Sequence, residues 1–546
     1  MRNLLTTCSG IALVVACTSG PAELKDPPIL KVTSPQRSLV QNGAGLLTVT
    51  GTVAPNADGV PVKTVEVNGV PATFGAEGGA FTASITIQPG ATLITTTATD
   101  EDGGVASDTR AVEAGDLRDA GANIDNAVSA AISTEAFAKI SDAASGLIKG
   151  MDLGAMIAPL QPMVHKGDEN GEDCLFARLF IDDLNISDVH LSLIPQSGGL
   201  AFAAEIDGLD VPGHMRYAAA CISGSNSIHV TADRVFLAGT LIVSPNGTSG
   251  FKTSLAGPTV QIDNLNISAS GIPGTILSLI DLNSAIETVI EKGAELFMEP
   301  MMNQALGALA GPKTLDVMGK TVTVQVSPSN VAFDPTAGVV GLNMSLVISG
   351  AEGAKFIYTD NGLPTQEPGD GFAIGLADDL ANEMFAEAHA LNLLNLSMPS
   401  NGGTFDATQI QMSMPAMISA DPADGAMKVV LGDVMLTFTS QGKPVAKAAL
   451  NASIDLQVQS ANNGYGVALA LGTPNIHVNT LDDIPNGTHL LDADLAKVTE
   501  VCLQAQIANI SKLLVNIPLP SVAGLQMRDL SVGSDDGYVM LKGKFE

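Results

Sequence analysis

Histidines and paired aspartates are the residues of this chain whose types could do acid–base chemistry. The chain has seven histidines, and all lie singly: His165, His190, His214, His229, His389, His477 and His489. Two aspartate pairs, Asp182-Asp183 and Asp482-Asp483, are adjacent, but neighbours on a strand point to opposite faces and do not form an acid/base pair. The sequence has no Gly-x-Ser-x-Gly elbow, Gly-rich phosphate loop or His-Glu-x-x-His motif. We therefore expect no catalytic residues, no cofactor and no enzymatic activity.

Acidic residues gather at one turn, where Asp100, Glu101 and Asp102 precede Gly103-Gly104. Carboxylates at this spacing could contribute to a calcium site. Acidic residues beside paired glycines are more often a solvated turn. We predict a turn, and no metal site.

Three cysteines lie in the body of the chain. Cys174 and Cys221 fall in the same strand-rich segment, and an oxidising compartment would allow them to form a disulfide. Cys502 shares the apolar face of a predicted helix with Leu495 and Val498, so a buried, inert thiol is the better interpretation than a nucleophile.

The N-terminus has the sequence pattern of a targeting signal. Met1-Arg2 is followed by an apolar run, Ile11 to Ala16, that ends on Cys17. The run is shorter than the ~20 residues a spanning helix needs, and it is typical of a signal peptide at residues 1–16. Val14-Val15-Ala16-Cys17 resembles the lipobox of bacterial lipoproteins. The resemblance implies cleavage before Cys17 and a lipid on its sulfur, whereas the alternative is an ordinary signal peptide.

Further residues bear on the lipidation site and on the cellular location. Cys8 is a poor rival to Cys17 because too little apolar sequence precedes it. Thr18 stands where inner-membrane lipoproteins usually have aspartate, so the resemblance implies an outer-membrane location, with the periplasmic or surface face unresolved. Residues 17–28 then form a polar, Pro-bearing tether.

Composition and charge limit the partners. Residues are 45% hydrophobic and 15% charged, with no Trp, as in a secreted, strand-rich protein. The net charge is −31, and removal of Arg2 with the signal peptide makes it −32 (25 basic against 57 acidic residues). Because phosphate binding needs a concentrated basic surface, we expect no nucleic-acid partner and no binding to anionic headgroups by bulk charge.

Short alternating runs dominate residues 29–115. Leu47–Val53, Phe81–Ile87 and Ala91–Thr99 alternate apolar and polar residues between turns, which predicts an antiparallel β-sandwich. Val67-Asn68-Gly69 and the acidic turn near Asp102 resemble bacterial immunoglobulin-like modules, which usually act as spacers or adhesive surfaces.

Beyond residue 120 the same order of elements occurs twice. Apolar spacings of three to five residues predict helices over 124–148, 275–309, 371–394 and 492–515, and strands lie between them. The pattern therefore indicates helix, sheet, long helix and short sheet, followed by a second copy of that order.

Gly121 to Glu546 resembles the bactericidal/permeability-increasing and lipopolysaccharide-binding proteins of the tubular lipid-binding superfamily. The resemblance is strongest at Ala377–Leu391, at Met417–Val429 and at Ile517–Pro520 with Gln526–Val532. It implies an α+β fold with two pseudo-symmetric halves, 120–365 and 366–546, each a curved antiparallel sheet wrapped on a long helix. It also implies an elongated apolar groove that binds lipid acyl chains, with transfer left open.

The chain departs from its mammalian members, which carry basic tips. This sequence shows no Lys/Arg cluster on the candidate tip turns, which disfavours capture of lipopolysaccharide through its phosphates. Neutral, zwitterionic or calcium-bridged lipids fit the composition better.

The candidate groove residues lie on the predicted helical stripes. They are Ile132, Phe137, Ile140, Ile286, Ile290, Phe297, Phe385, Leu495 and Val498. Any one of these side chains could instead pack a closed core. The alternative function is an envelope adhesin or scaffold, in which the immunoglobulin-like module binds a partner and the C-terminal region is structural.

Overall fold

The structure is a computed structural model. It describes residues 26–75, 78–158, 161–168, 175–219, 221–247, 250–272, 276, 311–359, 362–399, 405–420, 427–461, 466–481, 484, 495, 501, 503–511, 525–535 and 537–546. The chain divides into two compact units. Unit 1 comprises residues up to Gln36 together with Leu46–Thr86 and Ile94–Thr109, and unit 2 comprises Arg37–Gly45, Ile87–Leu93 and Arg110–Glu546.

Unit 1 is built from two sheets of short strands. One sheet has the order β1-β3-β7-β6, and β8, β4 and β5 are consecutive neighbours in the other, which β9 also joins. Alternate residues are buried, as in Gly79–Ile87, which is the period that a half-buried strand requires. The bounds are β1 Ile29–Ser34, β3 Gly45–Ala54, β4 Val62–Val67, β5 Val70–Pro71, β6 Thr73–Phe74, β7 Gly79–Ile87, β8 Gly90–Asp100 and β9 Val105–Asp119. Strands are thus present at the three runs where alternation predicts them.

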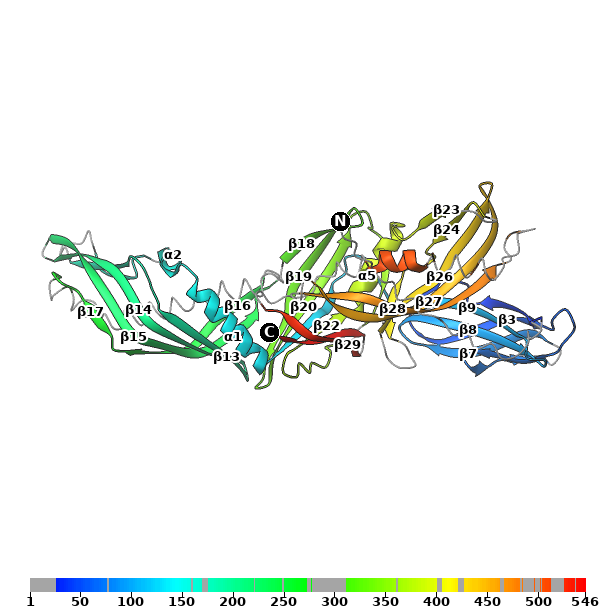
Figure 1. The fold of residues 1–546 in the computed structure, drawn as a ribbon, viewed down its shortest axis with the longest axis horizontal. Helices are drawn as coiled ribbons and strands as arrows, with labels where there is room; N and C mark the ends of the chain where they lie inside the picture. The colour runs from blue at the N-terminus through cyan, green and yellow to red at the C-terminus, as the bar shows by residue number, and fades with distance from the viewer. Residues whose placement is uncertain are drawn as a thin grey trace, which may run out of the picture. The chain divides into compact units, whose positions relative to one another are not determined.

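Unit 2 contains three sheets, coloured from cyan to red in Figure 1. The first sheet has the order β18-β19-β20-β10-β22-β30-β29 and consists of β10 Ile124–Ser133, β18 Gly311–Val317, β19 Lys320–Phe333, β20 Ala337–Ile348, β22 Phe372–Ala377, β29 Met527–Asp535 and β30 Tyr538–Phe545. Two further strands, β2 Leu39–Asn42 and β21 Lys355–Tyr358, pair with β9.

The second sheet of unit 2 has the order β11-β12-β14-β15-β16, with β13 paired to β14 and β17 to β15. Its strands are β11 Val164–Gly167, β12 Phe176–Ile181, β13 Asp188–Gln196, β14 Gly199–Ala219, β15 Ile222–Pro245, β16 Phe251–Asp263 and β17 Asn266–Ser268. The third sheet has the order β23-β24-β26-β27-β28, with β25 paired to β26. Its strands are β23 Leu396–Pro399, β24 Ala407–Gln411, β25 Met417–Ala420, β26 Met427–Ser440, β27 Lys443–Ala461 and β28 Gly466–Leu481.

The α+β fold class with long helices is wrong. Most described residues lie in strands, and the described helices are short: α1 Thr134–Lys149, α2 Leu153–Ile157 and α5 Asp378–Ala390. Residues 503–511 are also helical. The predicted helix over 275–309 lies outside the described residues except at Ile276. No helix in the described ranges has both the length and the apolar character needed to cross a membrane.

The over-prediction of helix has a physical cause. Residues 124–133 form strand β10 between β20 and β22, and residues 372–377 form β22 between β10 and β30. Strands with neighbours on both sides and cover on both faces lose the alternation of period two. All six residues of β22 are buried, and most of β10 is buried, so their apolar spacing imitates a helix. The helices begin only at Thr134 and Asp378.

Helix α1 covers an edge of the second sheet. It runs beside β13 (Figure 1), and Ser133 caps its N-terminus by accepting the Ala136 N–H at 3.1 Å. Ser141 Oγ accepts the N–H of Leu193 at 3.1 Å, and Ser145 Oγ accepts that of Leu191 at 2.9 Å. These amides belong to β13, at an edge of the sheet. The two serine hydroxyls accept the hydrogen bonds that a further strand would otherwise accept.

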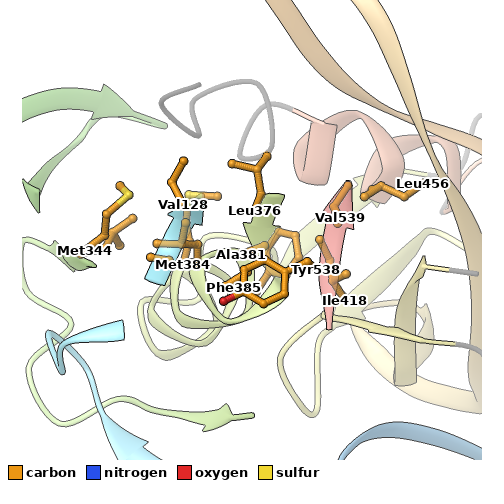
Figure 2. Packing of buried hydrophobic residues seen from close by; sticks show 14 of the residues in the cluster. Val128, Met344, Leu376, Ala381, Met384, Phe385, Ile418, Leu456, Tyr538 and Val539 are labelled. Carbon is orange, nitrogen blue, oxygen red and sulfur yellow. The ribbon is translucent and has the colours of Figure 1, made fainter. Parts of the chain in front are cut away.

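Helix α5 is buried almost all round. Figure 2 shows its Ala381, Met384 and Phe385 among Tyr538 and Ile418, with Val128 and Leu376 of the first sheet nearby. Phe385 is fully buried, and so is the Tyr538 ring. A helix that is enclosed on every side packs as part of a core.

Candidate functional site: the apolar inner face of the second sheet

The second sheet of unit 2 presents one continuous apolar face. Along β14 this inner face consists of Leu200, Phe202, Ala204, Ile206, Leu209, Val211, Gly213, Met215 and Tyr217. Alternation is interrupted at Gly208, where φ is +62° and a Cβ atom would lie 2.2 Å from Ser187 Oγ. Ile206 and Leu209 therefore both face inward. At about 3.3 Å per residue, Leu200 to Tyr217 extends roughly 55 Å along the strand.

Neighbouring strands extend this face sideways. In register, Val189 of β13 pairs with Ile206, Ile206 with Val235 of β15, and Val235 with Ile262 of β16. Further along, Val211 pairs with Val230, which pairs with Ile267 of β17. The inner face is thus apolar across as well as along the sheet.

Burial divides the inner face into two parts. Leu200, Phe202 and Leu237 belong to the large core cluster that includes α5. Beyond them lies a separate cluster of buried residues: Ala177, Leu179, Leu209, Val211, Met215, Tyr217, Ile228, Val230, Ala232, Val235, Ile272 and Ile276. Packed against it are apolar side chains that stay partly exposed: Val164, Ile181, Leu184, Ile186, Ile206, Val260, Ile262, Leu265, Ile267 and Ala269. Apolar side chains in the second part therefore keep some solvent-exposed surface.

The chain crosses the end of this cluster at Gly271. The Tyr217 hydroxyl donates to the Gly271 carbonyl at 3.2 Å, and Asn226 Nδ2 donates to the same carbonyl at 2.5 Å. Ile272 and Ile276 follow, and both are buried against the inner face. This crossing closes one end of the face with polar groups that are hydrogen-bonded.

The outer face of the same sheet carries charged side chains, together with the exposed apolar residues Phe236 and Ile242. Arg234 Nε lies 2.8 Å from Glu205 Oε1 and 3.3 Å from Asp207 Oδ1, and these carboxylates raise the pKa of the guanidinium. At the sheet edge, the Val189 N–H and Lys149 lower the pKa of Asp188. Two faces of such different character are expected where one faces solvent and the other an apolar environment.

Two histidine–aspartate pairs also lie on the outer face. His214 Nδ1 is 2.7 Å from Asp182 Oδ1, and His229 Nε2 contacts Asp210 Oδ1. All four side chains are substantially exposed. Asp182 thus pairs with His214, which lies 32 residues later in the chain, and not with its neighbour Asp183. Asp482-Asp483 lies outside the described residues.

The predicted groove residues fall into three groups. Phe137 and Phe385 are buried in the large core cluster, and Ile132, Ile140 and Leu495 pack against it while partly buried. The Phe137 ring lies 6.5 Å from that of Phe333. Ile286, Ile290, Phe297 and Val498 lie outside the described residues. The described candidates thus gather on one cluster, where Phe137 and Phe385 are packed core.

The partly exposed inner-face residues were missed as candidates. Ile206 and Ile262 lie in segments whose alternation does predict strands. The predicted groove residues all lie on helical stripes, so they include no inward position of these strands. The signal was the period of two itself, because it already separates an apolar from a polar face.

The acidic turn and the cysteines have these outcomes. Asp100 Oδ1 accepts the Gly104 N–H at 2.7 Å, which is a turn contact. Within the described part of the chain, no three His, Cys, Asp or Glu side chains are grouped to hold a metal ion.

Cys221 is disulfide-bonded. Cys17, Cys174 and Cys502 lie outside the described residues, so the lipid attachment, the Cys174–Cys221 pairing and the buried thiol stay predictions.

One family model matches an N-terminal segment of the chain. Residues 28–115 match the family model described as "Glucodextranase, domain B". This match supports the immunoglobulin-like β-sandwich predicted for residues 29–115. No curated protein sequence matches this chain.

Two solved structures resemble the chain over most of its length. The crystal structure of lipopolysaccharide binding protein is 15% identical, with 78% of this chain and 99% of that chain covered, at a TM-score of 0.39. The crystal structure of P47 of Clostridium botulinum E1 is 9% identical, with 79% and 100% covered, at a TM-score of 0.23. Both TM-scores lie below 0.5, a range in which two chains need not share a fold.

Proposed function

We propose that this chain binds an apolar ligand of the lipid acyl-chain class on the inner face of the second sheet. The observation that carries the proposal is the set of inward apolar side chains that stay partly exposed beside the buried cluster of β14 and β15. Contiguous apolar surface that stays exposed often marks a site where a ligand or partner binds. An acyl chain gains about 0.8 kcal/mol for each methylene that it buries there.

The proposal extends to the place where the protein works. Cys17, at the end of the apolar run, carries a lipid that anchors the chain to the outer membrane. Residues 17–28 then tether the folded units to that anchor. The function is binding, with no catalysis, and the ligand is a neutral or zwitterionic lipid, in keeping with the net charge of −31.

Substitutions on the two faces of the sheet test the binding site. Ile206→Trp enlarges a partly exposed inward side chain at the centre of the row Val189, Ile206, Val235 and Ile262. We expect it to weaken binding of a fluorescent fatty acid at least about tenfold, since excluding two methylenes costs ~1.6 kcal/mol. Titration of the purified full chain, followed by probe fluorescence, measures the change.

The matched control makes the same substitution on the outer face. Ile242→Trp on β15 alters a side chain that is 40% exposed, so the affinity for the probe should stay within about twofold of wild type. If both variants bind the probe as wild type does, the inner face is not the binding site. Ile262→Trp provides a second inward variant in case Ile206→Trp folds poorly.

A further inference from the structure

Helix α5 carries a row of carboxyl groups inside the protein. Asp379, Glu383 and Glu387 follow one another at intervals of four residues, so they lie on one face of the helix. Their exposed fractions are 1%, 0% and 0%. Sequence patterns place such residues on a solvated helix face, and acidic side chains are rarely fully buried without a partner of opposite charge. The row therefore requires an explanation.

Each carboxyl group accepts a hydrogen bond from the backbone of a different segment. Asp379 Oδ1 accepts the Thr359 N–H at 2.9 Å, just after β21. Glu383 Oε1 accepts the Gly121 N–H at 2.7 Å, in the turn before β10. Glu387 Oε2 accepts the N–H of Ile348, the last residue of β20. The row thus fastens α5 to three separate pieces of backbone.

The second carboxyl oxygen of each of the two glutamates accepts no such hydrogen bond. Glu383 Oε2 and Glu387 Oε1 are buried without a hydrogen-bond partner. A buried carboxylate with one donor keeps much of its desolvation cost. Burial raises the pKa of Glu383 to about 9 and that of Glu387 to about 7. Burial, with the charge of Asp378, raises the pKa of Asp379 to about 8.

Few charges face the row from the elements that pack on it. Helix α5 contacts β10, β20, β21, β22 and β25. In the described residues of these strands the titratable side chains are Asp125, Lys355 and Tyr358, of which Asp125 and Lys355 are exposed. Lys355 Nζ lies 2.6 Å from Asp119 Oδ1. The guanidinium carbon of Arg118 lies 3.2 Å from the centroid of the Tyr358 ring.

Only a few other charges act on the row. Arg118 lowers the pKa of Asp379, and Glu352 raises that of Glu387. His389, at the end of α5, contacts the Met412 carbonyl, and its burial lowers its own pKa. Among these groups, the cation Arg118 lowers the pKa of Asp379 alone. Ionisation of Asp379, Glu383 and Glu387 together would therefore place several negative charges in a buried space.

We propose that this row is a proton-controlled latch: while its carboxyl groups hold protons, α5 stays fastened to β20, to the Thr359 backbone and to the Gly121 turn, and their ionisation loosens the helix from all three. The opened state exposes the carboxyl groups to water, where each ionises near pH 4 to 4.5. The closed state therefore has its full stability below about pH 4.5. It loses stability progressively as pH rises above that value, and the loss is complete once pH has passed the closed-state pKa values of about 7 to 9.

Hydrogen exchange of the full chain tests the latch. After correction for intrinsic exchange rates, protection of α5 and of the Gly121 and Ile348 amides should fall at least about tenfold between pH 6 and pH 9. Helix α1, which is fastened to β13 by serine hydroxyls, is the internal reference and should change much less. Equal changes in both helices, or no change in α5, would overturn the proposal.

Glu383→Gln assigns the effect to the row. The amide keeps the acceptor for Gly121 but has no proton to lose, so the fall in α5 protection between pH 6 and pH 9 should shrink by about half or more. Glu135→Gln, on the exposed first turn of α1, is the matched control and should follow wild type. A Glu383→Gln profile identical to wild type contradicts the latch. If that variant does not fold, the comparison of α5 with α1 in wild type still decides.

Discussion

Asp433→Ala should lower the free energy of unfolding of unit 2 by about 3–5 kcal/mol, which is the usual cost of removing one partner of a buried ion pair. Asp433 is fully buried in β26 and lies 2.8 Å from Arg37 Nη1. Its other oxygen accepts the N–H of Ser38 at 2.7 Å and that of Ala111 at 3.3 Å. Alanine leaves the guanidinium and both amides without this acceptor. Chemical unfolding followed by circular dichroism measures the loss.

A neighbouring strand supplies the control for that prediction. Asp455 on β27 is 63% exposed and lies 4.0 Å from Lys428. Asp455→Ala should cost no more than about 1 kcal/mol, because an exposed ion pair contributes little. Equal losses for the two variants would mean that the Asp433 contacts do not fasten residues 37–38 and 111 to the third sheet.

Phe385→Ala should cost about 3–5 kcal/mol, the usual range for truncating a fully buried Phe. The ring lies within the core cluster, beside Ala381 and near Tyr538 and Ile418 (Figure 2). Tyr538 is itself held by hydrogen bonds to the carbonyls of Asn126 and Gly362, which limits how far the site can collapse. The same unfolding experiment measures the effect, and probe binding should be retained by the folded variant.

Phe236→Ala is the matched control, since this ring is 38% exposed on the outer face of the second sheet. Its loss should stay near 1 kcal/mol or below. A small loss for Phe385→Ala, together with weaker probe binding, would assign Phe385 to a ligand wall instead of the core, as the helical stripe predicts.

Strands with one solvated face could be predicted well from the sequence. β7 and β13 alternate because one side meets water, and that contrast is written into the residues. β10 and β22 could not be recognised as strands, since neighbours on both edges and cover on both faces remove the contrast. The error in fold class follows from these buried strands, which lengthened the predicted helices by six to ten residues.

For the candidate site, the sequence predicts the apolar character but not the residues that form it. An apolar interior follows from composition, but the particular residues depend on which strands pair and in which register. Ile206 and Ile262 lie 56 positions apart in the chain, and only the register through Val235 places them in one row. The buried row on α5 was hidden for the opposite reason. Asp379, Glu383 and Glu387 have the spacing of a solvated face, and only the tertiary contacts show that backbone amides take the place of water.

The central claim is that an acyl-chain ligand occupies the inner face of the second sheet, and its most direct test is the lipid content of the purified full chain. Native mass spectrometry gives the mass of the complex, and organic extraction separates a non-covalent ligand from any lipid attached to Cys17. We predict about one equivalent or more of extractable acyl-chain lipid for each chain. A chain that is empty in the native spectrum, and that yields no lipid on extraction, would contradict the claim and favour the adhesin or scaffold alternative.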